Sequence, residues 1–198
     1  MNWLAHLLLA KPDVESRLGN LLGDLVKGRE RRNLPAQFQL GLQCHQAIDS
    51  YTDSHWIVKR SKQRIRANYL RFSGILVDVF YDHLLAQNWH HYSALSLSDF
   101  TTQVYSSFTD YLEQIPLRAS LIIRRMIQED WLGSYQSFWG IETTLQRISW
   151  RITRRTNCCC DLTPAINELK EQYFEFEQDF REFFPQLTKH IQSWNFSH

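Results

Sequence analysis

The first half of the chain carries acidic and histidine side chains at positions where helical spacing predicts an apolar face. His45 and Asp49 are four residues apart on one such face. Asp78 and Asp82 repeat that spacing on another, and His83 follows directly. Side chains four residues apart are neighbours on a helix, so two carboxylates there repel each other, and burying them unpaired is costly. A single bound cation would remove that conflict, because carboxylate oxygens and neutral imidazole nitrogens both bind metal ions.

Three more residues extend this set. His6 lies in the apolar opening segment, Asp24 lies in an apolar run, and Asp53 continues the row of Asp49 by one turn. Mixed nitrogen and oxygen ligands suit manganese, iron, zinc or nickel better than calcium. Helical proteins commonly build such sites from the side chains of facing helices. The residues themselves therefore favour one shared metal site.

Each residue taken alone also has a structural interpretation. His6 could be a core histidine with a satisfied hydrogen bond, and His45 with Asp49 could be a local pair. Asp53 could cap the next helix, and Asp78 could form a salt bridge. Without a metal, however, each of these buried polar groups would need its own partner, whereas one shared site satisfies them together.

Apolar residues recur every three or four positions along most of the chain, which is helical spacing. Thr163 and Pro164 form a helix start signal, and Ser98 is predicted to cap another helix, with Asp99 in its first turn. We predict an all-α fold, a single-domain helical bundle over residues 1–198 with about eight helices. The eight predicted segments are 14–27, 35–52, 54–69, 70–90, 98–115, 117–130, 141–155 and 164–182.

Composition limits the class of protein. Seven glycines and five prolines in 198 residues argue against a many-turned β sandwich. Hydrophobic residues make up 43% and charged residues 22%, which is typical of a folded domain. The net charge of +1 argues against a uniformly basic nucleic-acid-binding surface. No segment approaches the roughly 20 apolar residues of a membrane span, and the first residues lack the basic part of a signal peptide.

The four cysteines bear on the cellular compartment. Cys44 is isolated, whereas Cys158, Cys159 and Cys160 are adjacent, a spacing that suits neither a disulfide framework nor a zinc site. Together with the lack of a predicted signal peptide, this favours a reducing cytoplasm. The sequence leaves the oligomeric state open.

Four spaced motifs give the chain a family resemblance. They are Asn2-x-Leu4-Ala5-His6, Gly19-Asn20-Leu21-Leu22-x-Asp24, Gly41-x-x-x-His45-x-x-Ile48-Asp49-x-x-Thr52-Asp53 and Asp78-Val79-x-x-Asp82-His83-x-Leu85, followed by Trp89. Together they resemble the acyl carrier protein phosphodiesterases, also called acyl carrier protein hydrolases. The resemblance covers residues 1–90 well and is weaker beyond them.

The resemblance implies a fold and an activity. That family is similar to an atypical branch of the HD-domain metal-dependent phosphohydrolases, which are all-helical. The usual dipeptide of that superfamily is His-Asp, whereas this sequence has the reversed order in Asp82-His83. Its members hydrolyse the phosphodiester that joins 4′-phosphopantetheine to a serine of acyl carrier protein. They use a divalent metal, manganese above all, with magnesium, iron or another divalent ion as alternatives.

On this basis we assign roles to the eight acidic and histidine residues. The predicted metal ligands are His6, Asp24, His45, Asp78, Asp82 and His83. Asp49 and Asp53 are predicted catalytic residues, one of which would protonate the serine leaving group. Asp49 could instead bind the metal or orient a ligand histidine.

Basic residues are gathered into three clusters, each of which could also be an ordinary solvated face. One follows Asp24 directly, a second spans residues 59–66, and the third is a helical stripe from Arg147 to Arg155. The carrier protein that the resemblance implies as substrate is acidic, so a basic cluster should steer it to the site. We choose the first cluster because it lies nearest in sequence to a predicted ligand, and predict that the carrier protein binds Lys27, Arg29, Arg31 and Arg32.

Two other functions stay open from the sequence. The first is an HD-like phosphohydrolase that acts on a nucleotide or another small phosphate ester. The second is a non-catalytic helical binding module whose acids and histidines are structural and bind no metal. Nucleic-acid binding is disfavoured by the net charge, although the arginine stripe over 147–155 could follow phosphates.

Overall fold

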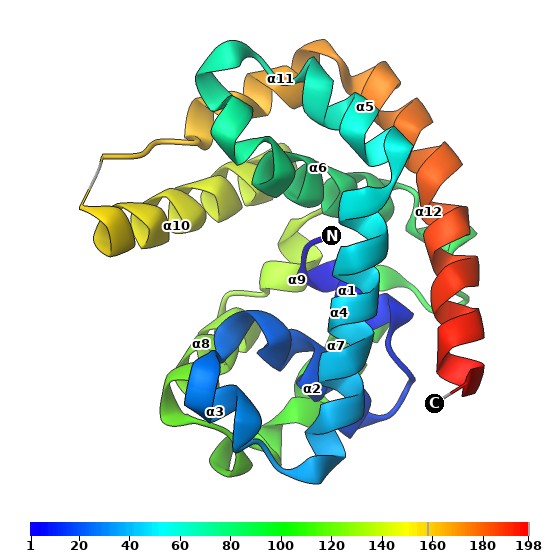
Figure 1. The fold of residues 1–198 in the computed structure, drawn as a ribbon, viewed down its shortest axis with the longest axis vertical. Helices are drawn as coiled ribbons and strands as arrows, with labels where there is room; N and C mark the ends of the chain where they lie inside the picture. The colour runs from blue at the N-terminus through cyan, green and yellow to red at the C-terminus, as the bar shows by residue number, and fades with distance from the viewer. Residues whose placement is uncertain (158, 198) are drawn as a thin grey trace.

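The computed structural model describes residues 1–157 and 159–197, and these residues form helices and loops without a strand (Figure 1). The α-helices are α1 (Trp3–Leu9), α2 (Val14–Leu25), α3 (Gly28–Arg32), α4 (Gln39–Ser54), α5 (Trp56–Arg64), α6 (Ser73–Gln87), α7 (Leu97–Thr109), α8 (Leu117–Gln128), α9 (Trp131–Ser134), α10 (Phe138–Thr156), α11 (Ile166–Glu171) and α12 (Tyr173–Ser197). The 3₁₀ helices are η1 (Ala36–Phe38), η2 (Ala67–Phe72), η3 (Trp89–His91), η4 (Leu112–Gln114) and η5 (Thr163–Ala165). The predicted all-α class is confirmed.

Each of the eight predicted segments contains a helix, but three details differ. The segment 164–182 divides at Gln172 into α11 and α12. Ser98 was the wrong cap for α7, because the Ser96 hydroxyl accepts the hydrogen bond from the Asp99 amide at 3.0 Å. Asp53 does not cap α5, since that role falls to His55, whose Nδ1 accepts from the Ile57 amide. Short helices between the long ones account for the larger number observed.

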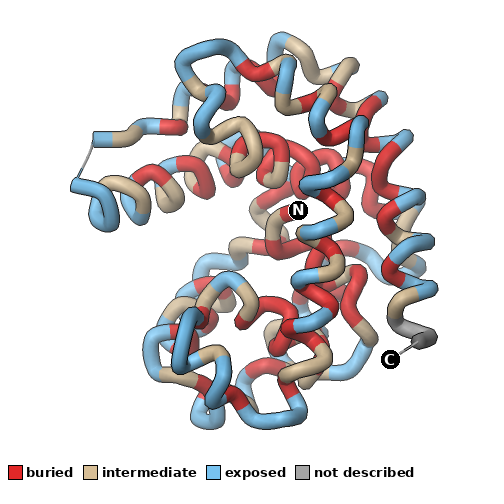
Figure 2. Tube along the Cα trace, viewed as in Figure 1, coloured by how far each residue is buried: buried red, intermediate tan, exposed pale blue. Residues whose placement is uncertain are grey.

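The core gathers around α6 and the aromatic face of α12. Phe176, Phe180 and Phe183 are fully buried, and Phe80 of α6 meets Phe176 edge to face at 5.5 Å between ring centroids. Helix α12 also packs against α4 and α5, so it supports the helix that carries His45. Buried stretches of the other helices face the same interior (Figure 2).

Helices α2 and α4 approach so closely that their backbones touch at two glycines. A Cβ on Gly41 would lie 2.6 Å from the amide nitrogen of Asn20, and a Cβ on Gly19 would lie 3.1 Å from the Cα of Gly41. Real Cβ atoms essentially never come as close as 2.6 Å, and 3.1 Å is tighter than most real contacts, so the pair of glycines permits the crossing. The crossing brings the acidic end of α2 to the middle of α4.

Two predictions from the sequence concern membrane spans and disulfide bonds. Across the described residues, no helix combines the length and apolar character that a membrane crossing requires. Cys44, Cys159 and Cys160 are free thiols, while Cys158 lies outside the described residues.

Replacing Gly41 with alanine should destabilise the fold, because the added methyl group must push α2 away from α4. We expect Gly41→Ala to lower the free energy of unfolding by about 1–3 kcal/mol, the usual cost of overpacking. Gly74→Ala is the matched control, since its Cβ would meet only the flexible Lys62 side chain at 3.6 Å. The control should be neutral or more stable by about 0.5–1 kcal/mol, and urea denaturation of both variants measures the difference. Equal effects would contradict a close crossing.

Candidate metal centre

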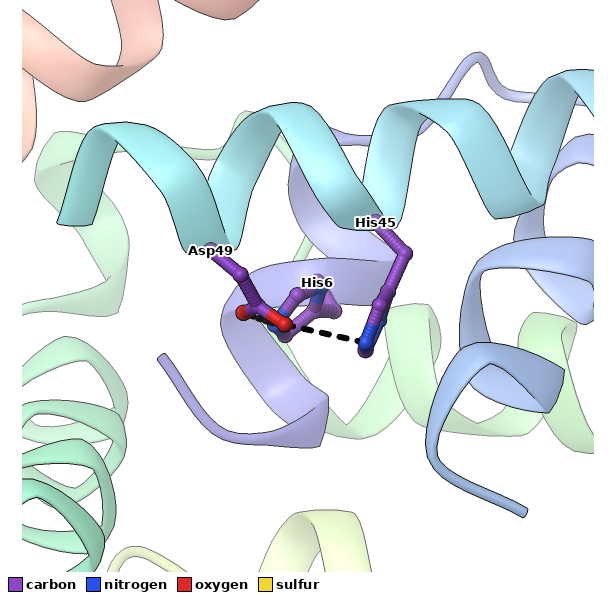
Figure 3. Close-up of side chains that lie close together, drawn as sticks. All are labelled: His6, His45 and Asp49. Atoms are coloured by element: carbon purple, nitrogen blue, oxygen red, sulfur yellow. Dashed lines mark ion pairs between the residues drawn. The ribbon is translucent and has the colours of Figure 1, made fainter. Parts of the chain in front are cut away.

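Three side chains from two helices meet at the centre of the site. Helix α4 places His45 and Asp49 one turn apart, and α1 points His6 at the same carboxylate (Figure 3). His6 Nε2 lies 3.2 Å from Asp49 Oδ1, and His45 Nε2 lies 3.1 Å from Asp49 Oδ2. The ligand atoms of the three residues all lie within 4.8 Å of one another, which would allow them to hold a metal ion.

The two imidazoles stack, and a glycine gives them room. The ring centroids of His6 and His45 are 4.4 Å apart at an interplanar angle of 27°. A Cβ on Gly23 of α2 would lie 2.5 Å from His45 Cδ2 and 2.8 Å from its Nδ1. Any side chain at residue 23 would therefore displace the His45 ring from Asp49.

A hydrogen bond to Asn20 of α2 determines which ring nitrogen of His6 carries a hydrogen. Its Nδ1 lies 2.8 Å from the amide oxygen of Asn20, which can only accept, so Nδ1 carries the hydrogen. Burial lowers the pKa of His6 despite the attraction of Asp49, which favours the neutral ring. In that ring Nε2 carries a lone pair, and this buried atom makes no hydrogen bond.

Asp49 is held as a carboxylate. Burial alone would raise its pKa, but contacts with His45 and His6 outweigh burial and hold the pKa well below its ordinary value. The Asp49 carboxylate therefore lies against one nitrogen of each imidazole. Two imidazole nitrogens and a carboxylate oxygen at this spacing are the donor set of a metal site.

Asp24 is the next nearest of the predicted ligands. Its Oδ1 lies 3.9 Å from His45 Nε2, and its Oδ2 accepts a hydrogen bond from the indole nitrogen of Trp3 at 2.9 Å. Trp3 in turn stacks on Trp131 at 5.7 Å between centroids. The carboxylate of Asp24 is thus oriented by a stacked aromatic pair and keeps one oxygen directed at His45.

The carboxylates border a pocket of about 180 Å³. Four of the predicted acids line it, and the basic residue in its wall is Arg151; the acids are Asp24, Asp49, Asp53 and Asp78. Asp53 is exposed and accepts a hydrogen bond from Lys62 Nζ at 2.9 Å. The pocket therefore joins a negative wall to the basic side chain of Arg151, a combination suited to a cation together with an anion.

Two other predicted ligands bind the backbone. Asp82 is fully buried and caps α1, since its carboxylate accepts from the Leu4 amide at 2.7 Å and the Ala5 amide at 3.4 Å. Burial raises the pKa of Asp82 to about 7. His83 Nδ1 contacts the carbonyl oxygen of Tyr135 at 2.7 Å. The structure does not bring Asp82 or His83 into the group formed by His6, His45 and Asp49.

Asp78 forms an ion pair with the amino group of Met1. Its Oδ1 accepts from the Met1 amino group at 2.9 Å, and its carboxylate also lines the pocket. Asp78 and Asp82 therefore fix the start of α1 from one face of α6, which aims His6 at Asp49.

The predicted partner-binding residues lie on and beside α3. Lys27, Arg29 and Arg32 are exposed, and Arg31 is partly buried. None of the four belongs to the residues that line the pocket.

Three contributors to the site had no predicted role there. Asn20 lies one turn before Asp24 and Trp3 lies one turn before His6, so helical spacing could have placed both beside a predicted ligand. Arg151 was recognised only as part of a basic stripe. Its place in the pocket depends on how α10 packs against α6, which spacing along one helix does not reveal.

Comparison with known proteins gives a consistent result over nearly the whole chain. The acyl carrier protein phosphodiesterase family profile matches residues 1–187. A protein of that name from Yersinia pestis is 31% identical over 97% of this chain and 98% of its own length. Its namesake from Pectobacterium atrosepticum is 31% identical over 96% of each chain, and that from Photorhabdus laumondii is 27% identical over 99% of this chain and 98% of its own. The chain matches no solved structure.

The site should bind a divalent cation, and binding should stabilise the native state. We expect Mn²⁺ at about 100 times its Kd to add roughly 2.7 kcal/mol to the free energy of unfolding. His45→Ala should abolish this gain because it removes one of the two imidazole ligands. His91→Ala, an exposed histidine away from the pocket, is the control and should keep it. Thermal unfolding with Mn²⁺ and with a chelator measures the gain, and its survival in His45→Ala would contradict the assignment.

Proposed function

This chain belongs to the acyl carrier protein phosphodiesterase family, and from that premise we propose that it hydrolyses the phosphodiester between 4′-phosphopantetheine and a serine of holo acyl carrier protein. Water attacks phosphorus, the bond to the serine oxygen breaks, and the products are apo carrier protein and 4′-phosphopantetheine. The observation that carries the proposal is the buried His6 Nε2 facing the Asp49 carboxylate beside a pocket lined by Arg151.

The residues fit a divalent metal ion. Two imidazole nitrogens and a carboxylate oxygen converge, and Asp24 Oδ1 lies 3.9 Å from one of those nitrogens. This set of nitrogen and oxygen donors suits manganese, the ion we propose, and magnesium or iron is the alternative. When bound, the ion supplies positive charge for the phosphoryl oxygens and makes water more acidic.

The neighbouring residues hold these groups in place. Asn20 fixes the tautomer of His6 so that Nε2 is free to bind, and Trp3 keeps Asp24 turned toward His45. Asp49 stays ionised between the two imidazoles, so it acts as a ligand and not as a proton donor. Arg151 offers the pocket a positive charge for the phosphodiester anion.

The pair formed by Asp53 and Lys62 is the proposed source of the proton that the departing serine oxygen needs. Asp53 lines the same pocket and accepts a hydrogen bond from Lys62 Nζ, so the ammonium group carries the proton and Asp53 holds it at the exposed edge of the site. A poor alkoxide leaving group gains most from such a donor.

Incubation of the purified protein with holo acyl carrier protein and Mn²⁺ tests the proposal, with loss of phosphopantetheine read by mass. Activity should vanish with a chelator and fall about 10–100-fold in Asp24→Ala, which disturbs the metal surroundings. Asp53→Asn should lower kcat by about 10²–10⁴-fold. Asp110→Asn is the control, because this acid is exposed and does not line the pocket.

Three outcomes would overturn the proposal. Turnover of nucleotides or other small phosphate esters without turnover of the holo protein would indicate a small-ester phosphohydrolase. No turnover of either substrate would indicate a binding module. Full activity in Asp24→Ala and Asp53→Asn would remove both residues from the reaction.

A further inference from the structure

The C-terminal half of α10 presents an exposed aromatic side chain beside basic ones. Trp150 is 62% exposed, and the guanidinium of Arg154 lies over its ring at 4.6 Å from the centroid. Arg151 and Arg155 are also exposed on this half of the helix. In Figure 1 this half of α10 extends away from the other helices. An exposed tryptophan among arginines is typical of a protein interface, where these two residue types dominate the binding energy.

The arginines of α10 differ in whether they form an ion pair with an acidic side chain. Arg147 lies over Trp131 and pairs with Glu129 at 2.9 Å, so its charge is already neutralised. No carboxylate of residues 1–157 or 159–197 forms an ion pair with Arg151, Arg154 or Arg155. Three guanidinium groups within two turns thus lack a counter-charge, and an acidic partner would supply one.

This basic face leads into the pocket. Arg151 lines it together with Asp24 and Asp49, and Arg154 and Arg155 follow one turn further out along the helix. One turn of α-helix advances about 5.4 Å, so a molecule held at Arg154 and Arg155 would lie next to the pocket entrance. A bound protein could extend a modified side chain past Arg151 toward Asp49.

The basic cluster on α3 neither reaches the pocket nor carries an exposed aromatic side chain. Its arginines, Arg29, Arg31 and Arg32, do not line the pocket, and no large exposed hydrophobic side chain lies on α3. The combination of unpaired charge, an aromatic anchor and continuity with the site is found on α10.

We propose that Trp150, Arg151, Arg154 and Arg155 form the docking surface for an acidic protein, which under the proposed function is the holo acyl carrier protein. Carboxylates of the partner pair with the outer arginines, Trp150 supplies an apolar anchor, and Arg151 receives the phosphodiester. A protein fits better than a nucleic acid, because the four carboxylates around the pocket would repel a continuous phosphate backbone. This inference rests on the proposed function for the identity of the partner.

Binding of holo acyl carrier protein, measured by calorimetry at low salt, tests the surface directly. The double variant Arg154→Glu with Arg155→Glu should raise Kd about tenfold or more, and high salt should shrink the difference. Trp150→Ala should also raise Kd about tenfold, as truncation of an interface anchor does. Thermal unfolding with and without Mn²⁺ shows that each variant retains its fold and its metal centre.

The chain supplies matched controls for both changes. Arg29→Glu with Arg32→Glu reverses the same number of charges on α3, and Trp139→Ala removes a 70% exposed tryptophan at the opposite end of α10. Both controls should leave Kd within about twofold of the wild type, because neither touches the proposed surface. A larger loss of binding in the α3 pair than in the α10 pair would overturn the proposal, as would equal binding by all variants.

A single-stranded RNA oligonucleotide provides the last comparison. If the α10 pair loses RNA binding while binding of the carrier protein is unchanged, the surface serves nucleic acid and the proposal is wrong.

The docking surface and the proposed reaction can be refuted separately. Hydrolysis with unchanged Kd in the α10 variants would refute the docking surface alone. Loss of carrier binding in those variants, with no release of phosphopantetheine by the wild type, would refute the reaction and leave the surface standing.

Discussion

The carboxylate of Asp49 contacts two imidazoles, one from α1 and one from α4. The packing of the surrounding helices is what brings these three side chains together. His45 shares a helix with Asp49, but His6 reaches it only because α6 fixes the start of α1 through Asp78 and Asp82. Helix α2 completes the group by approaching α4 at Gly19 and Gly41, which brings Asn20 and Asp24 to the histidines. Buried polar groups usually have partners, so the atoms of this group that make no hydrogen bond, His6 Nε2 among them, are the ones a bound ion would satisfy.

Helical periodicity was sufficient to predict the all-α class, most of the long helices and the pairing of His45 with Asp49, although α12 continues to Ser197, beyond the predicted end at 182. These are local properties, since residues four apart on a helix face the same way whatever the helix packs against. Spacing could not distinguish the role of Asp82 from that of Asp49, because both lie four residues from another polar side chain on an apolar face. Asp82 meets the amide groups at the start of α1, whereas Asp49 meets two imidazoles, and only the packing of α1 decides which. The position of Arg151 in the pocket wall could not be predicted for the same reason.

The net charge of +1 hides a separation of charge across the molecule. Four carboxylates gather around a pocket of about 180 Å³, while the unpaired arginines of α10 lie along its approach. The negative wall concentrates cations, and the basic helix attracts anions. An overall charge close to zero is therefore compatible with strong local fields of both signs, which direct different ligands to adjacent places.

The cap that Asp82 provides for α1 has a consequence for the order of events during synthesis. Helix α1 is synthesised before α6, yet its start is fixed by a residue 78 positions later in the chain. At roughly 5–20 residues per second, the ribosome needs about 4–16 seconds to bridge that interval. A seven-residue helix is too short to persist alone in water, so His6 waits in an unformed segment until α6 has emerged. The group formed by His6, His45 and Asp49 therefore depends on the first 82 of the 198 residues, because α1 is held in place only once α6 is present.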